Sequence, residues 1–151
     1  MSGNHREVVE LRIPSRTEHL SIVNRVAEEL ADHLGMSEDD RDAVATSVIE
    51  AATNAIQHGN RNDATKTVSV RFIVTPGKLE VIVKDEGLGF DPSTVDDPLK
   101  PENLLRERGR GLFLIRAYMD DVRYSSARKS GTVVRLIKRL APPAAQREAG
   151  H

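Results

Sequence analysis

Glu50 and Asn54 stand four positions apart in a stretch that is otherwise mostly apolar. On a helix this spacing places both side chains on one face, and Ser47 and Gln57 continue the same polar stripe. A carboxylate can take a proton from a hydroxyl group, and a neutral amide one turn away can help to hold a hydrated divalent cation. Taken alone, the pair is more typical of an ordinary polar helix face, so its meaning depends on what accompanies it.

A second candidate segment, Asp85-Glu86-Gly87-Leu88-Gly89-Phe90, follows an expected strand. An acidic side chain at a strand end can accept a hydrogen bond from an amino group, and alternate glycines let a ligand approach the backbone closely. A tight turn with a solvated acid is the alternative interpretation. The chain lacks both the third glycine of a dinucleotide fingerprint and the Gly-x4-Gly-Lys-Ser/Thr pattern of a P-loop.

The third candidate segment, Gly109-Arg110-Gly111-Leu112, stands directly before an expected helix. Unpaired backbone N–H groups and the positive end of the helix dipole favour an anion at such a position. Arg106 and Arg108 would add positive charge there, whereas a flexible hinge is the alternative interpretation. Residues 106–139 hold 10 Lys and Arg against 3 Asp and Glu. An anion site explains this basic segment more simply than nucleic-acid binding does.

Hydrophobic periodicity predicts the elements that position these residues. Alternating apolar residues predict strands at 7–13, 68–74, 79–83, 122–126 and 132–140. Apolar residues at helical spacing predict helices at 20–34, 37–57 and 112–119, with a capping box at 15–18 and a cap at Ser37. The order of these elements predicts an α/β fold, a two-layer α/β sandwich in which helices pack on one face of a mixed, mainly antiparallel sheet.

The 151 residues are the size of one domain, which we expect to span residues 7–140 with disordered tails at 1–6 and 141–151. The absence of cysteine excludes a disulfide framework, a thiol nucleophile and a zinc site built on thiolates. No apolar run approaches the roughly 20 residues that span a bilayer, and the N-terminus lacks the apolar segment of a signal peptide. We therefore expect a cytoplasmic protein that does not associate with membranes.

The candidate segments, together with Gly131-Thr132 before the last strand, occur in an order that resembles the GHKL (Bergerat-fold) ATPases over roughly residues 7–140. The run Glu50-Ala-Ala-Thr-Asn54-Ala-Ile-Gln-His58-Gly59 is similar to the N box of one branch, the anti-sigma-factor serine kinases of bacteria. The Ile13-Pro14 entry to the first helix and the stretch 111–121 are similar to that branch too. Arg110, between two glycines, departs mildly from the usual small or apolar residue.

The resemblance implies a role for each candidate residue. Asp85 would accept a hydrogen bond from the adenine amino group of ATP, supported by Thr132, while Gly87 and Gly89 keep the pocket floor open. Asn54 would be the protein ligand of Mg²⁺, and Glu50 would act as the general base toward the attacking hydroxyl group. Residues 91–108 would form a lid over the phosphates, which would be bound by Arg108 or a neighbouring arginine and by the amides of Gly109, Gly111 and Leu112.

The resemblance also implies partners. The acceptor would be a serine or threonine of an anti-anti-sigma (STAS) protein, and the chain would sequester a sigma factor through a contact that includes Arg25. Such kinases commonly form homodimers, which the edge strand 7–13 could mediate. The alternative is a non-catalytic module that holds MgATP and a sigma factor or another regulator. The catalytic domain of a histidine kinase is disfavoured, because no acceptor-histidine segment precedes the ATP-binding part.

Overall fold

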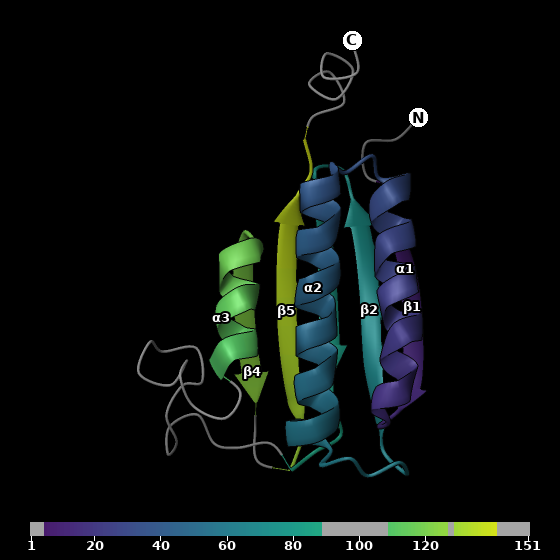
Figure 1. The fold of residues 1–151 in the computed structure, drawn as a ribbon, viewed down its shortest axis with the longest axis vertical. Helices are drawn as coiled ribbons and strands as arrows, with labels where there is room; N and C mark the ends of the chain where they lie inside the picture. Colours follow the sequence, from purple (N-terminus) through teal and green to yellow (C-terminus); the bar gives the residue numbers. More distant parts are fainter. Residues whose placement is uncertain (1–4, 89–108, 127–128, 142–151) are drawn as a thin grey trace.

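The computed structural model describes residues 5–88, 109–126 and 129–141, in which three helices cover one face of a sheet (Figure 1). The strands are β1 (Glu7–Pro14), β2 (Thr67–Thr75), β3 (Lys78–Lys84), β4 (Asp121–Ser126) and β5 (Thr132–Arg139). The helices are α1 (Leu20–His33), α2 (Glu38–Asn54) and α3 (Gly109–Tyr118), with short turns η1 (Thr17–His19) and η2 (Ala55–Gly59). The predicted two-layer α/β sandwich and its element order are confirmed.

The sheet has the strand order β1-β2-β3-β5-β4, and each of its ladders is antiparallel. The sequence predicts a mixed, mainly antiparallel sheet, and the antiparallel pairing extends to β5, which lies between β3 and β4 and pairs antiparallel with both. One row across the sheet aligns Phe72, Val81 and Leu136, which are all fully buried. The regular alternation in these strands therefore supplies one continuous apolar face.

The helices bury that apolar face. α2 lies over the middle of the sheet between α1 and α3, and it contacts both β3 and β5 (Figure 1). Val23 from α1, Val44 and Val48 from α2 and Ile115 from α3 are fully buried against the sheet residues. Burial of such side chains contributes about 1.5–3 kcal/mol each. The core therefore fixes α2, which carries Glu50 and Asn54.

The helix ends agree only in part with the sequence. The Ser37 side chain accepts a hydrogen bond from the backbone N–H of Asp40, which confirms the predicted cap of α2. The capping box at residues 15–18 is wrong, because the Ser15 hydroxyl group is drawn away to the backbone oxygen of Lys66. α3 begins at Gly109 rather than at residue 112, so both glycines of the third segment lie inside its first turn. The amides of a first helical turn have no helical partner and are therefore available to a ligand.

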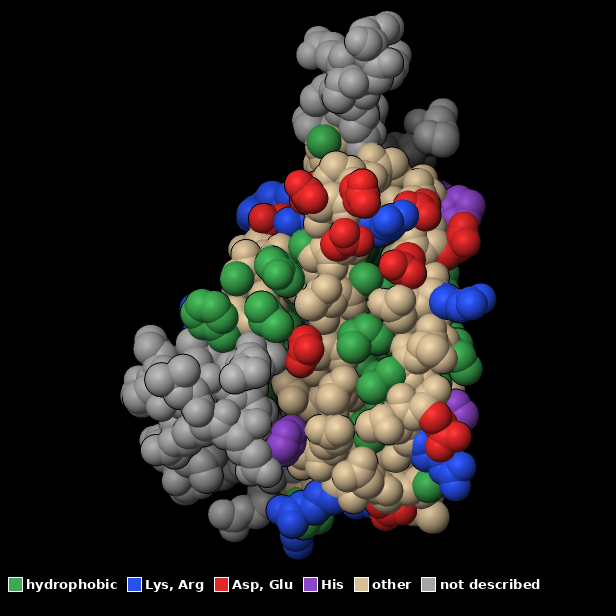
Figure 2. Space-filling view, viewed as in Figure 1, with side chains coloured by type: hydrophobic (Ala, Val, Ile, Leu, Met, Phe, Trp, Pro, Cys, Tyr) green, Lys and Arg blue, Asp and Glu red, His purple; other side chains and the backbone are tan. Residues whose placement is uncertain are grey.

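The surface carries three features that bear on partners. Acidic side chains gather over the first turns of α2 and hydrophobic ones over α3 (Figure 2). Phe113 and Tyr118 of α3 are 58% and 40% exposed, and Ile22 of α1 is 48% exposed. β1 pairs with β2 at one edge of the sheet, as predicted for an edge strand.

In the described part of the chain, helices fall short of the length and hydropathy required to cross a bilayer.

Candidate functional site

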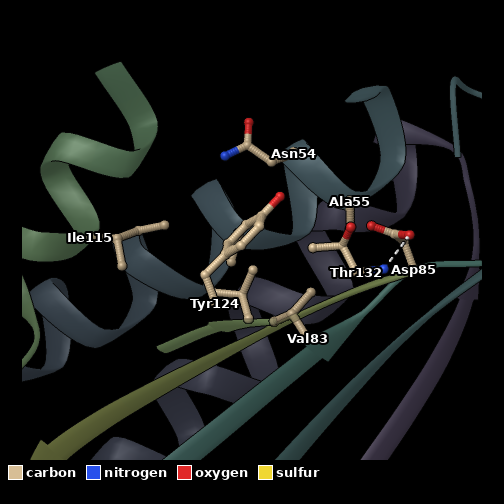
Figure 3. Close-up of a pocket in the computed structure, with 9 residues that line it drawn as sticks. Asn54, Ala55, Val83, Asp85, Ile115, Tyr124 and Thr132 are labelled. Carbon is tan, nitrogen blue, oxygen red and sulfur yellow. Dashed lines mark hydrogen bonds between the residues drawn. The ribbon is translucent and has the colours of Figure 1, made fainter. Parts of the chain in front are cut away.

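A cavity lies where the end of α2 meets the sheet and α3 (Figure 3). Three of the candidate polar residues line it: Asn54 at the end of α2, Asp85 directly after β3, and Thr132 at the start of β5. The other lining residues are apolar or aromatic: Ala51, Ala55, Val83, Ile115, Tyr124 and Val134. Apolar walls with a few convergent polar groups are typical of a small-molecule site.

Asp85 is the most tightly held polar group of this cavity. Its side chain is 4% exposed, and its Oδ1 accepts hydrogen bonds from the backbone N–H of Gly87 at 2.9 Å and of Thr132 at 3.1 Å. The Asp85 backbone N–H in turn donates to the Thr132 carbonyl oxygen at 3.1 Å. The carboxylate is therefore fixed as a hydrogen-bond acceptor before any ligand arrives.

Three glycines surround the Asp85 carboxylate. A Cβ atom at Gly59 would overlap the Asp85 side chain, and one at Gly87 would overlap the Gly59 carbonyl oxygen. Gly131 has a φ of +77°, and a Cβ there would overlap the Asp85 carbonyl oxygen. Sequence reasoning assigned a role only to Gly87 among these three. The backbone of these glycines therefore packs directly against Asp85, at positions where a side chain would not fit.

Thr132 presents a hydroxyl group beside Asp85. Its Oγ1 lies 3.0 Å from the Ser126 hydroxyl oxygen, so the two groups share a hydrogen bond. Both side chains are buried, at 9% and 8% exposure. This hydrogen bond holds the Thr132 hydroxyl oxygen in place next to the Asp85 carboxylate (Figure 3).

Glu86 is adjacent to Asp85 but serves the backbone rather than the cavity. Its Oε2 accepts hydrogen bonds from the backbone N–H and the hydroxyl group of Thr67. These bonds, with smaller contributions from the charges of Arg12 and Lys66, lower the pKa of Glu86 below its ordinary value. The two neighbouring acids therefore have different roles. Asp85 lines the cavity, and the Glu86 carboxylate is bonded to Thr67.

Asn54 and Glu50 lie on one face of α2, one turn apart, as their spacing predicts. The Asn54 Nδ2 is buried and, among the described residues, has no hydrogen-bond partner. A buried unsatisfied amide at the edge of a cavity has the capacity to bind a polar ligand. Glu50 is half-buried and lies one turn before the cavity rather than in its lining.

The chain leaves α2 through a widened turn instead of a further α-helical turn. Residues Ala55–Gly59 form a single π-helical turn, and the Asn60 backbone N–H donates to the Ala55 carbonyl oxygen at 2.8 Å. The sequence predicts an α-helix as far as about Gln57, so this end is a correction. In this wider turn Gly59 packs against Asp85. A π-helical turn is rare, so the sequence pattern does not predict this contact.

The other predicted site residues are not among the described residues that line the cavity. Gly89, Arg108 and the proposed lid at residues 91–108 fall outside the described residues. Gly109, Gly111 and Leu112 form the first turn of α3, of which the backbone alone is described. Arg25 is exposed on α1 and does not line the cavity.

Tyr124 is a cavity residue that sequence reasoning missed. It stands opposite Val134 in the β4–β5 ladder. Its ring lies across the cavity with the hydroxyl group directed toward the end of α2 (Figure 3). Its alternation with Val122 could have indicated that it faces the helices, but not that it lines a site.

The sequence matches known proteins over most of its length. A family described as "Histidine kinase-like ATPase domain" matches residues 13–138. The serine-protein kinase RsbW of Bacillus subtilis (strain 168) is 34% identical over 143 residues, which cover 91% of this chain and 88% of that protein. The protein of the same name from Bacillus licheniformis is 36% identical over 140 residues, 89% of this chain and 86% of its own length.

Solved structures share the fold at lower identity. The RsbU and RsbW domains of Rv1364c from Mycobacterium tuberculosis superpose with a TM-score of 0.65 at 17% identity, over 91% of this chain and 33% of that one. The histidine kinase domain from the Erythrobacter litoralis EL346 blue-light activated histidine kinase gives a TM-score of 0.55 at 20% identity, over 90% of this chain and 64% of that one. Likeness at this identity supports the fold alone.

Proposed function

This chain belongs to the histidine kinase-like ATPase domain family, and we propose that it phosphorylates a serine or threonine of an anti-anti-sigma (STAS) protein and sequesters a sigma factor when that protein is phosphorylated. Its relatives at 34–36% identity are named serine-protein kinases. The chain is therefore a protein-serine/threonine kinase that binds ATP. The predicted membership of the GHKL superfamily, in its serine-kinase branch, is confirmed.

The arrangement around Asp85 carries the nucleotide part of the proposal. A buried carboxylate that two backbone N–H groups hold in place is an acceptor of fixed position, and the adenine amino group is a donor that suits it. Ala55, Val83 and Val134 supply apolar walls for a flat ring. The Thr132 hydroxyl group would contribute a second polar contact to the base.

Asn54 and Glu50 carry the catalytic part of the proposal. The unsatisfied Asn54 Nδ2 can donate a hydrogen bond to a phosphate oxygen at the cavity edge. We assign the Oδ1 of the same amide to Mg²⁺, because this ion takes oxygen ligands and would neutralise the phosphates. Glu50 takes the proton from the acceptor hydroxyl group as the oxygen bonds to the γ-phosphorus of ATP and ADP departs. The amides of Gly109, Gly111 and Leu112 at the start of α3, with Arg108 and the lid at residues 91–108, would hold the phosphate oxygens.

The regulatory part of the proposal concerns protein partners. Arg25 and Ile22 are exposed three residues apart on α1, so together they offer a charged and apolar contact for a sigma factor. The exposed Phe113 and Tyr118 of α3 add apolar surface of the kind that protein partners bury. The edge strand β1 would pair with a second copy in a homodimer. Transcription would then be regulated through protein contacts, in the cytoplasm, without direct contact to nucleic acid.

A non-catalytic MgATP-binding module that sequesters a regulator is the alternative. The half-buried Glu50 on the same helical face as Asn54 favours the kinase, since a module that only binds ATP has no use for a base there. The two proposals agree on the nucleotide and differ in phosphoryl transfer.

Thermal unfolding with nucleotides tests the nucleotide site. A ligand at 100 times its Kd stabilises the folded state by about 2.7 kcal/mol. For a domain of this size, MgATP should therefore raise Tm by roughly 5–10 °C. ATP with a chelator should raise it less, and MgGTP should not raise it, because the guanine carbonyl oxygen would face the Asp85 carboxylate. No shift with millimolar MgATP would contradict an intact ATP site.

The Gly59→Ala substitution tests the floor of the site. A methyl group there overlaps the Asp85 side chain, so the carboxylate must turn away from the position in which it meets the adenine. We expect ATP affinity, measured by calorimetry, to fall by roughly 10-fold, the equivalent of one hydrogen bond.

Gly77→Ala is the matched control for Gly59→Ala. Gly77 lies in the β2–β3 turn at a φ of +87°, and a Cβ there meets no atom within 4 Å. This variant should lose about 1 kcal/mol of stability through backbone strain and keep the ATP affinity of the wild type. Equal affinity in both variants would show that Gly59 does not shape the site.

A further inference from the structure

Asn60 is a buried polar residue that the proposed function does not use. Its side chain is 1% exposed although it lies in the connection between η2 and β2. Its Nδ2 donates to the Ser15 hydroxyl oxygen at 2.8 Å and to the Thr67 carbonyl oxygen at 3.0 Å. Its Oδ1 accepts from the Glu86 backbone N–H at 2.8 Å. One side chain therefore connects the ends of β1, β2 and β3.

The chemistry of these contacts requires an amide at position 60. The Glu86 N–H can only donate, so its partner must be an acceptor, and the Thr67 carbonyl oxygen can only accept, so its partner must be a donor. A carboxylate satisfies the first requirement and not the second, and an apolar side chain satisfies neither. The Ser15 hydroxyl group, itself donating to the Lys66 carbonyl oxygen at 2.8 Å, accepts the remaining amide proton.

Asn60 also adjoins the residues that form the cavity floor. It follows Gly59, which packs against the Asp85 side chain and whose carbonyl oxygen packs against Gly87. It holds Glu86, the residue between Asp85 and Gly87, by the backbone. The Glu86 side chain is anchored separately to Thr67. The segment from Asp85 to Gly87 is thus held by Asn60 at the Glu86 backbone and by Thr67 at the Glu86 side chain.

We propose that Asn60 is the positioning residue of the adenine subsite: its amide, through the Glu86 N–H and the Thr67 carbonyl oxygen, sets the place of the Asp85 carboxylate and thereby the preference for an adenine amino group. This inference rests on the proposed ATP site. Asn60 does not touch the nucleotide in this proposal, and its effect reaches the ligand through residues 85–87.

The test compares ATP with inosine triphosphate, which has a carbonyl oxygen in place of the adenine amino group. Because that oxygen would face Asp85, the wild type should bind ATP roughly 100-fold more tightly than inosine triphosphate. In Asn60→Asp, which keeps the shape of the side chain and loses both donors, the ratio of the two affinities should fall about 10-fold. Calorimetry gives both affinities for each protein at a temperature where circular dichroism shows it folded.

Asn62→Asp is the matched control, because Asn62 is exposed in the same connection and the substitution adds the same charge. It should keep the wild-type ratio. Asn60→Ala places no charge in the interior and removes the acceptor as well, so its ratio should fall at least as far as that of Asn60→Asp. If Asn60→Asp does not fold, the ratio of the two affinities in Asn60→Ala is the test.

The ratio separates positioning from a merely structural role. A general loss of stability lowers Tm and weakens both nucleotides together, and the ratio then stays at the wild-type value. An unchanged ratio in the folded Asn60 variants would overturn the inference and leave the ATP site intact. A wild type that binds neither nucleotide, or binds both equally, would instead contradict the proposed site at Asp85.

Discussion

The Asp85→Asn variant is expected to lose nucleotide binding while it keeps its fold. The asparagine oxygen can still accept from the backbone N–H groups of Gly87 and Thr132, which hold the carboxylate in the native protein. Its amide nitrogen then faces the adenine amino group, so two donors meet where a donor met an acceptor. Loss of a charge-assisted hydrogen bond with a buried donor left unpaired costs about 3 kcal/mol or more, roughly 100-fold in affinity.

Calorimetry with MgATP measures this loss, and thermal unfolding provides the check on the fold. Tm without nucleotide should change by a few degrees only, while the increase in Tm with MgATP should disappear. Asp121→Asn is the matched control, because Asp121 lies at the start of β4, pairs with Arg123 and does not line the cavity. ATP affinity within threefold of the wild type in Asp85→Asn would remove Asp85 from the site.

The sequence was sufficient for the elements that local periodicity defines. The alternation around Phe72 and Val81 predicted the strands β2 and β3, and Ser37 predicted the start of α2. These features depend on neighbours within a few residues, for which spacing is a reliable guide. The family resemblance added the roles of Asp85 and Asn54, which spacing alone leaves ambiguous.

The features that sequence reasoning missed depend on long-range contacts. Ser15 has the residue type and spacing of a helix cap, but its hydroxyl group bonds to Lys66, 51 positions away. Gly59 stands two residues beyond the predicted helix end at residue 57, and only the fold brings it against Asp85. Asn60 is indistinguishable in sequence from an ordinary turn residue, yet it is buried among three strand ends. Local patterns cannot reveal such partners, because the competing tertiary bond decides the outcome.

The Glu50→Ala variant is expected to bind ATP normally and to lose phosphoryl transfer. Glu50 does not line the cavity around Asp85, so its removal should leave the affinity for MgATP within about twofold of the wild type. A general base contributes roughly 10²–10⁴-fold to a rate. The rate of transfer to a purified STAS protein that the wild type phosphorylates should fall by that factor, measured in a single turnover with labelled ATP.

Glu29→Ala is the matched control for Glu50→Ala, because Glu29 is exposed on α1 and pairs only weakly with His33 at 3.3 Å. It should transfer phosphate at the wild-type rate. Transfer at that rate by Glu50→Ala would show that another group takes the proton, while loss of ATP binding together with transfer would show that Glu50 shapes the nucleotide site. Separation of the two properties is the result that distinguishes a kinase from a module that only holds MgATP, because only the kinase needs a base beside Asn54.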